Sequence, residues 1–369
     1  MNNKVSFYLN GRLVSIENPS PDLLLIDYLR SPDVALSGPK KPCGQGGCGG
    51  CTVILSRWDE KQNKPEHRAI NSCLRPVCAL GGLVVTTVEG TGAVRKPDAQ
   101  FLQHTLTASR SAAPIGEQQS PVFIEASQAA GKKRNSVLKA TAKLRGKDVA
   151  AHLTLVEDVA ACPSELSHDG MNPVAHQLAL YNGSQCGYCS VGFVMNMSEF
   201  IVSNPEATKK QIEDAFDGNL CRCTGYRAIL TGMKTFASNW HEADVKHQIK
   251  CIEDHVGEAQ LPGTVEIPFP RAAHGPAEPV SSDAGRQHWR TPTSLSELAE
   301  ILHNERKQKI RLVHGNTSYG VYKPEYLDTT LFVDIRLIPE LNFPIETRRK
   351  TLNEIVVAAG TSYSELIDL

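Results

Sequence analysis

Three cysteines stand within nine residues of the glycine-rich stretch "PCGQGGCGGCTVIL", Pro42 to Leu55. Cys43, Cys48 and Cys51 follow the spacing C-x4-C-x2-C, and Cys73 follows Cys51 after 21 intervening residues. Plant-type [2Fe–2S] centres take their four thiolate ligands from this spacing. Because a loop must wrap around the small cluster to present three thiolates, it needs the positive φ angles that glycine allows. The sequence therefore predicts an iron–sulfur centre on these four cysteines.

Zinc and disulfides are the alternatives for this group. Structural zinc sites draw on paired C-x2–4-C segments, whereas a single loop here holds three of the four cysteines. The N-terminus lacks a signal-peptide core and no apolar run reaches the ~18–20 residues of a membrane span. We therefore expect a cytoplasmic, reducing location, where cysteine clusters are more often metal or redox sites than disulfides. Cys78 is surplus, and we expect it in the core.

A second group combines Cys186-x2-Cys189 with Cys221-x-Cys223, in "GSQCGYCSVG" and "NLCRCTGYR". Each pair stands at the predicted start of a helix, where unpaired N–H groups and the helix dipole favour an anionic thiolate cluster. The four thiols could hold a second [2Fe–2S] centre. Taken alone the spacing also suits zinc, but the neighbouring iron–sulfur loop favours iron.

The elements that must position the first group form a small mixed β-sheet domain, predicted for residues 1–92. Residues 4–16 read as a hairpin around Asn10-Gly11, followed by a short helix in "SPDLLLIDYLRS" and strands in "CTVILS", "HRAINSC" and "GGLVVTTVEG". Residues 93–171 are polar and weakly periodic, which predicts a partly disordered insertion. Seven Lys or Arg between Lys132 and Lys147 leave a nucleic-acid or docking patch as the second interpretation.

The second group falls in a region of helical periodicity, residues 172–240, where four short-linked helices predict a bundle. Thr208 and Gln211 have capping-box spacing at the third of these helices. Residues 241–288 have the proline-rich composition of a linker. From 289 to 369 helix and strand alternate, which predicts an α+β domain that is incomplete within this chain.

The stretch "RLVHGNTSYGVYK", Arg311 to Lys323, is a predicted strand that runs into a polar turn. It lacks the Gly-Lys-Ser ending of a mononucleotide P-loop. Exposed N–H and hydroxyl donors in such a turn could bind a pyrophosphate, but the residues alone favour a plain surface turn.

Composition excludes several function classes. The chain has 369 residues, 41% hydrophobic and 21% charged, and a net charge of −1, so no basic field predicts nucleic-acid or membrane binding. Its 12 histidines show no metal-ligand pairing, and we assign no catalytic residue.

The order of these motifs, with "NSCLRPVC", "VTTVEG", "GSQCGYCSVGFVM" and "GNLCRCTGYRAI", resembles the xanthine dehydrogenase and aldehyde oxidase family of molybdenum hydroxylases. The likeness covers residues 1–92, 172–240 and about 289–369. Ser190-Val191, Ala228 and Gly81-Gly82 depart from the family pattern without removing a ligand. The family does not normally carry the 93–171 insertion with Cys162.

The resemblance implies a multidomain α+β protein with a β-grasp ferredoxin-like [2Fe–2S] domain, a four-helix-bundle [2Fe–2S] domain and part of an FAD-binding domain. It implies that all eight cysteines are cluster ligands and that Gln185 lies beside a molybdopterin cofactor. It also implies contacts to the FAD pyrophosphate from the residues Leu312, Val313, His314, Gly315, Asn316, Thr317, Ser318 and Tyr319. His314 stands where the family usually has a small or aliphatic residue.

The family passes electrons from a molybdopterin site through two [2Fe–2S] centres to FAD and then to NAD or O2. The resemblance therefore implies an electron-relay portion of such an oxidoreductase, without the substrate-oxidising site. It implies a molybdopterin-binding domain or subunit as partner, and a homodimer. The alternative is a stand-alone iron–sulfur electron-transfer protein that serves a separate catalytic chain.

Overall fold

The computed structural model describes residues 3–91, 138–144, 147–153, 172–241, 264–343, 346–348 and 354–367. Cys162, Cys251, most of the predicted insertion and residues 242–263 of the predicted linker lie outside these ranges. Within 93–171, an antiparallel hairpin joins β6 (Leu138–Leu144) to β7 (Lys147–Leu153), in a region where the weak periodicity predicts no regular element.

A five-stranded sheet forms the N-terminal part, in the order β2-β1-β5-β3-β4. Its strands are β1 (Lys4–Leu9), β2 (Arg12–Glu17), β3 (Thr52–Asp59), β4 (Lys64–Asn71) and β5 (Val84–Thr86). Asn10 and Gly11 both have positive φ, at 49° and 80°, as a two-residue turn of type I′ requires. The predicted hairpin is confirmed.

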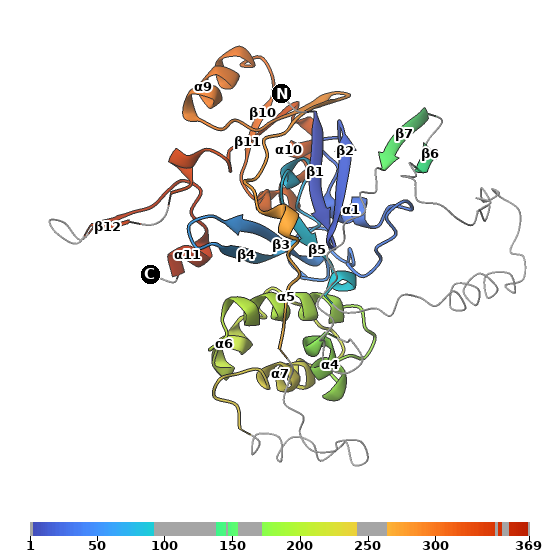
Figure 1. Ribbon diagram of the computed structural model, residues 1–369, viewed down its shortest axis with the longest axis vertical. Coiled ribbons are helices and arrows are strands. Elements are labelled where there is room, and N and C mark those ends of the chain that lie inside the picture. The colour runs from blue at the N-terminus through green and yellow to red at the C-terminus, as the bar shows by residue number, and fades with distance from the viewer. Residues whose placement is uncertain are drawn as a thin grey trace, which may run out of the picture.

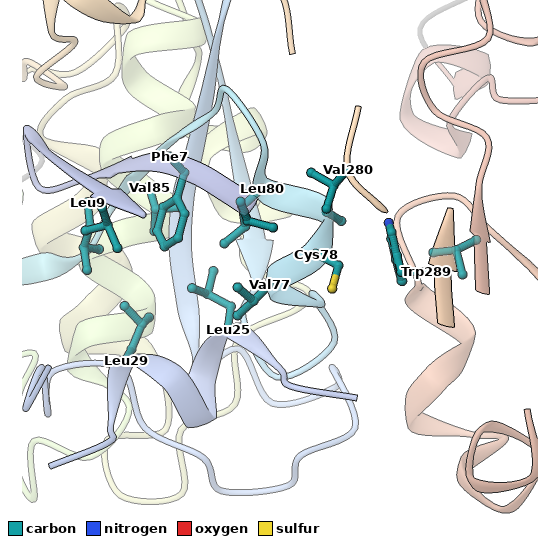
Figure 2. Packing of buried hydrophobic residues seen from close by; sticks show 14 of the residues in the cluster. Phe7, Leu9, Leu25, Leu29, Val77, Cys78, Leu80, Val85, Val280 and Trp289 are labelled. Carbon is teal, nitrogen blue, oxygen red and sulfur yellow. The ribbon is translucent and has the colours of Figure 1, made fainter. Parts of the chain in front are cut away.

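Helix α1 (Leu25–Leu29) packs its buried Leu25 and Leu29 against this sheet. Figure 2 shows these leucines facing Phe7, Val77 and Val85 in the core. Cys78 is fully buried in the same core, as predicted from its position outside the ligand spacing.

Four helices lie beyond the sheet: α4 (Pro173–Leu180), α5 (Ser190–Ser203), α6 (Lys209–Asp214) and α7 (Arg227–Lys234). The helix α5 lies between the sheet and the other three, in contact with β3, β4 and α4 (Figure 1). Its mostly apolar sequence follows from this position, because Met195 packs on Ile54 of the sheet while Phe193 packs among the helices. The predicted capping box of Thr208 and Gln211 is confirmed.

A second sheet forms the C-terminal part, in the order β10-β11-β9-β8. It contains β8 (Ser281–Ala284), β9 (Gln287–Arg290), β10 (Ile310–Val313) and β11 (Leu331–Asp334), and the last three run parallel. The helices α9 (Leu295–Asn304) and α10 (Lys323–Asp328) connect the parallel strands. The range predicted as linker contains the strand β8. This strand forms because it pairs with β9 as a hairpin.

The chain then forms the short strands β12 (Glu346–Arg348) and β13 (Glu354–Val356) and the helix α11 (Tyr363–Ile367). None of the helices in the described ranges is both long and apolar enough to cross a bilayer.

The two sheets share one hydrophobic core. Val280 and Trp289 of the C-terminal part are buried in the same cluster as Cys78 and Leu80 of the first sheet (Figure 2). The C-terminal unit is therefore packed directly onto the unit that carries the first cysteine group.

Candidate metal centres and nucleotide loop

The hairpin of β3 and β4 brings Cys51 and Cys73 together. Cys51 directly precedes β3 and Cys73 follows β4, and the two strands pair with Thr52 opposite Asn71. Because both cysteines lie at the same end of an antiparallel ladder, two residues that are 22 positions apart in sequence become neighbours in space. Both side chains are buried, and the Ser72 hydroxyl donates to the Cys51 carbonyl at 2.6 Å.

The other two cysteines of the first group lie on the loop before β3. Cys43 is exposed and Cys48 half-buried. The loop turns back on itself at Gly46, where φ is +78° and an added Cβ would lie 2.4 Å from the Leu74 side chain. Asn71 holds the turn by donating its side-chain amide to the Gly46 carbonyl at 3.0 Å.

The thiols of the first group are arranged as two hydrogen-bonded pairs, Cys51 with Cys73 and Cys43 with Cys48. The hydrogen bond from Cys51 lowers the pKa of Cys73 to about 7, while the same bond and burial raise the pKa of Cys51. Burial opposes ionisation of Cys43, but hydrogen bonds outweigh it and its pKa is lowered. The first of these bonds comes from the Gln45 N–H, 3.3 Å from Sγ.

The second group shows the same pairing, but only Cys189 stands at a helix start, since Cys221 and Cys223 lie in the turn before α7, whose N-cap is Tyr226. The Sγ atoms of Cys186 and Cys223 are 3.6 Å apart, and Cys189 is hydrogen-bonded to Cys221. Cys189 is the residue before the first turn of α5, as predicted. Burial, followed by the Cys221 bond, raises the pKa of Cys189 to about 12.

The turn before α7 is shaped around Cys221. The Cys221 N–H donates to the hydroxyl of Tyr226 at 3.0 Å, and Tyr226 itself adopts a positive φ of 68°. Thr224 approaches the Cys221 sulfur twice, with Oγ1 at 3.0 Å and N–H at 3.5 Å. Sequence reasoning missed Tyr226 and Thr224, although the "CTGYR" turn that holds them is part of the motif.

Each cysteine group holds four thiols that are arranged as two pairs. All eight cysteines are free thiols, and 3.6 Å far exceeds the ~2.05 Å of a disulfide bond. A [2Fe–2S] centre takes four thiolates as two pairs, one on each iron. Both groups supply that donor set.

A backbone contact joins the two cysteine loops. The Leu220 N–H donates to the Cys48 carbonyl at 3.0 Å, and Leu220 is the neighbour of Cys221. At Gly192 in α5 the approach is so close that an added Cβ would lie 2.2 Å from the Gly49 carbonyl. Asn219, which sequence reasoning also missed, is buried at this contact and accepts from Asn196 at 2.9 Å.

The loop after β10 packs against the first cysteine group. Gly315 and Asn316 have φ of +69° and +61°, and a 3-10 turn follows at Thr317–Gly320. Tyr319 contacts the apolar cluster that contains Cys51 and Cys73. Gly320 lies against Gln45, where an added Cβ would be 2.4 Å from the Gln45 carbonyl.

The residues predicted to contact the pyrophosphate differ in solvent exposure and in whether their polar atoms are already hydrogen-bonded. Thr317 and Ser318 are exposed, whereas Val313 and Asn316 are buried. The Asn316 Nδ2 is committed to the Leu74 carbonyl at 2.7 Å. His314 and Leu312 are exposed, and His314 Nε2 lies 2.8 Å from the side-chain oxygen of Asn342.

Gln185 is exposed and directly precedes Cys186. Two apolar side chains next to the second group are also exposed, Tyr188 at 50% and Leu220 at 58%.

Three family models match the chain. Residues 7–78 match a 2Fe-2S iron-sulfur cluster binding domain, residues 162–234 a [2Fe-2S] binding domain, and residues 283–369 an FAD binding domain in molybdopterin dehydrogenase. The second match begins at Cys162, ten residues before the predicted boundary of the helical domain.

Known proteins match over most of the chain. A xanthine dehydrogenase of Dictyostelium discoideum is 29% identical over 350 residues, and a xanthine dehydrogenase/oxidase of Rattus norvegicus is 30% identical over 357 residues. These alignments cover 86% and 91% of this chain but 20% and 21% of the two relatives. Aldehyde oxidase 2 of Cavia porcellus is 28% identical over 98% of this chain and 23% of its own length. The chain thus spans about a fifth of the length of the relatives it matches.

Among solved structures, quinoline 2-oxidoreductase from Pseudomonas putida 86 aligns with 67% of this chain and 98% of its own. Its sequence identity to this chain is 20% and its TM-score 0.36.

Proposed function

From the match of this chain to the N-terminal iron–sulfur and flavin segment of the xanthine dehydrogenase and aldehyde oxidase family, we propose that it is an electron-relay portion of a molybdenum hydroxylase. Electrons from a molybdopterin site would pass through the second and the first cysteine group to the loop of residues 312–319. When bound, [2Fe–2S] clusters and FAD supply the one-electron and hydride chemistry of such a relay. This chain contributes the ligands and holds the sites in contact.

The observation that carries the proposal is the order of these contacts. The second cysteine group touches the first through the bond between Leu220 and Cys48, and the first group touches Tyr319 of the 312–319 loop and the following Gly320. A relay needs such a series of neighbouring sites. The ligands would be Cys43, Cys48, Cys51 and Cys73 for one centre, and Cys186, Cys189, Cys221 and Cys223 for the other.

The finer fold names follow as part of the proposal. The five-stranded sheet with α1 across it corresponds to a β-grasp ferredoxin-like domain, and α4 to α7 to a four-helix bundle. The C-terminal sheet corresponds to the front part of an FAD-binding domain. The parallel order β10-β11-β9 supports this last assignment, because ligands of such sheets bind at the carboxyl ends of the strands.

The partner of the relay would be a molybdopterin-binding domain or subunit beside Gln185. The exposed Tyr188 and Leu220 support a contact surface there, since the donor must approach the second group from that side. NAD or O2 as acceptor, a homodimer and a cytoplasmic location complete the proposal. The shared core of the two sheets favours this relay over a stand-alone iron–sulfur protein, because the flavin unit is built onto the first cluster unit.

The test is metal and sulfide analysis of the full chain purified without oxygen. We expect about four irons and about four acid-labile sulfides per chain, since each centre holds two of each. Electron paramagnetic resonance (EPR) of the reduced protein should show two distinct [2Fe–2S] signals. Colourless protein that contains zinc and no sulfide would contradict the proposal.

A further inference from the structure

Two arginines from different units of the molecule lie within electrostatic range of one aspartate. Arg336 donates its Nε to the Asp334 carboxylate at 2.7 Å, and their side chains are 12% and 1% exposed. Arg75, two residues after Cys73, lies within electrostatic range of both. Its Nη2 donates to the carbonyl of Ala79 at 2.6 Å, and the described residues offer it no hydrogen-bonded carboxylate. Positive charge therefore exceeds negative charge at this buried place.

The same arginines have unused donors. Arg75 Nε and Arg336 Nη2 are shielded from solvent, and neither has a hydrogen-bond partner among the described residues. The Oδ1 of Asn316, a residue that is 4% exposed, is unpartnered in the same way. Buried donors are normally paired, so the unused guanidinium N–H groups indicate an acceptor beyond the described residues, and the excess of positive charge favours an anionic one.

The position of this cluster is the second observation. Asp334 ends β11 and is the register partner of Val313, the last residue of β10. The loop of residues 314–319 starts from that same edge, and Asn316 is bonded to Leu74, the neighbour of Arg75. The arginines therefore lie at the carboxyl ends of parallel strands, where sheets of this kind bind their ligands.

We propose that Arg75 and Arg336 form an anion subsite that takes a phosphate group of the flavin dinucleotide. This inference rests on the proposed role of the 312–319 loop. A guanidinium fork matches phosphate oxygens geometrically, and one phosphate would satisfy both unused donors and balance the excess charge. Since Arg75 belongs to the first iron–sulfur unit, the flavin site is then completed by that unit.

The experiment compares FAD, riboflavin and inorganic pyrophosphate on the full chain and on three variants. Flavin binding is followed by fluorescence quenching and pyrophosphate binding by calorimetry. We expect R75M and R336M to weaken FAD binding by tenfold or more and to leave riboflavin, which has no phosphate, unchanged. R286M is the matched control, because Arg286 is exposed just before β9 and so lies at the opposite edge of the sheet.

Several outcomes overturn the subsite. Unchanged FAD affinity in both variants would overturn the subsite and leave the proposed flavin role intact. A loss of riboflavin affinity as large as the loss of FAD affinity would also overturn the subsite, because the arginines would then only hold the loop in place. If the unmodified chain binds no FAD, the flavin role fails, and pyrophosphate decides the subsite: binding that R75M abolishes supports it, and no binding overturns it.

Folding of each variant is checked by circular dichroism and by the visible spectrum. Should a methionine variant fail to fold, R75K or R336K replaces it, since lysine keeps the charge without the fork. The lysine variant should still bind FAD more weakly than the unmodified chain, and unchanged affinity would again overturn the subsite.

Discussion

Cys73 and Cys78 are two buried cysteines only five positions apart, and we predict that the first is a cluster ligand and the second a core residue. Cys73 is hydrogen-bonded to Cys51, whereas Cys78 packs among apolar side chains, and both are at most 1% exposed. We expect C73A to lose the first centre, so that iron falls from about four to about two per chain and one EPR signal disappears. C78A should keep both signals and lose only some stability, because it leaves a small cavity. Equal iron content in the two variants would show that Cys73 is not a ligand.

His67 provides a second prediction for a single residue, the dependence of folding stability on pH. Burial lowers the pKa of His67 to about 4, and its Nδ1 lies 2.7 Å from the hydroxyl of Ser56. The unfolded chain, with a histidine pKa of about 6.5, binds more protons between these values, so stability is lost as the pH falls from about 6.5 to about 4.

The measurement is the free energy of unfolding in urea at pH 7 and pH 5. H67Q, which keeps an oxygen for Ser56, should lose less stability over this interval than the unmodified chain. H303Q, at an exposed position of α9, should behave like the unmodified chain. A loss in H67Q as large as in the unmodified chain would remove His67 as the cause.

At the scale of elements, we expect the contact between α5 and the first cysteine loop to set the distance between the two proposed centres. An alanine at Gly192 would place its Cβ 2.2 Å from the Gly49 carbonyl, so the loop must move away from the helix. We expect G192A to slow electron exchange between the centres and to reduce their magnetic splitting in EPR, because both effects weaken with distance.

G218A is the matched control for this contact. Nothing lies within 4 Å of a Cβ added at Gly218, although this residue is only one position from Asn219 at the interface. G218A should therefore leave exchange and splitting unchanged. If G192A binds both clusters and retains the full splitting, the α5 contact does not control their separation.

Elements defined by local chemistry could be predicted from the sequence. The Asn10-Gly11 turn needs positive φ at both residues, and the capping box of Thr208 and Gln211 closes over three positions. Local patterns decide such features because the interacting groups are neighbours along the chain. The strand β8 has no such signal, since its sequence "SSDA" gains order only by pairing with β9.

The spacing of the candidate ligands could also be read from the sequence, but the contacts between sites could not. Asn316 and Leu74 are separated by 242 positions, and no pattern in either segment marks the other as its partner. Arg75 and Arg336 likewise come within electrostatic range of each other only because the two sheets pack together. Long-range juxtapositions depend on tertiary packing, which single-sequence propensities do not contain.

At the scale of the whole molecule, the shared core makes the flavin unit and the first cluster unit one cooperative structure. Trp289 is fully buried in the cluster that contains Cys78 and Leu80, and its Nε1 donates to the Thr291 hydroxyl at 3.1 Å. We expect W289A to cost about 3–5 kcal/mol, since it removes a large side chain from a packed interior. Because the core spans both sheets, the loss should lower the stability of the iron–sulfur unit as well.

Denaturant titrations with two probes test this coupling. Visible absorbance reports the iron–sulfur centres and circular dichroism reports the helices and sheets. In W289A both midpoints should shift to lower denaturant, whereas L327A, at a side chain that is 77% exposed on α10, should move neither. A W289A protein whose visible-absorbance midpoint stays in place while circular dichroism reports an earlier transition would show that the two units unfold independently. The relay would then depend on contacts at the cysteine loops alone, rather than on a common core beneath them.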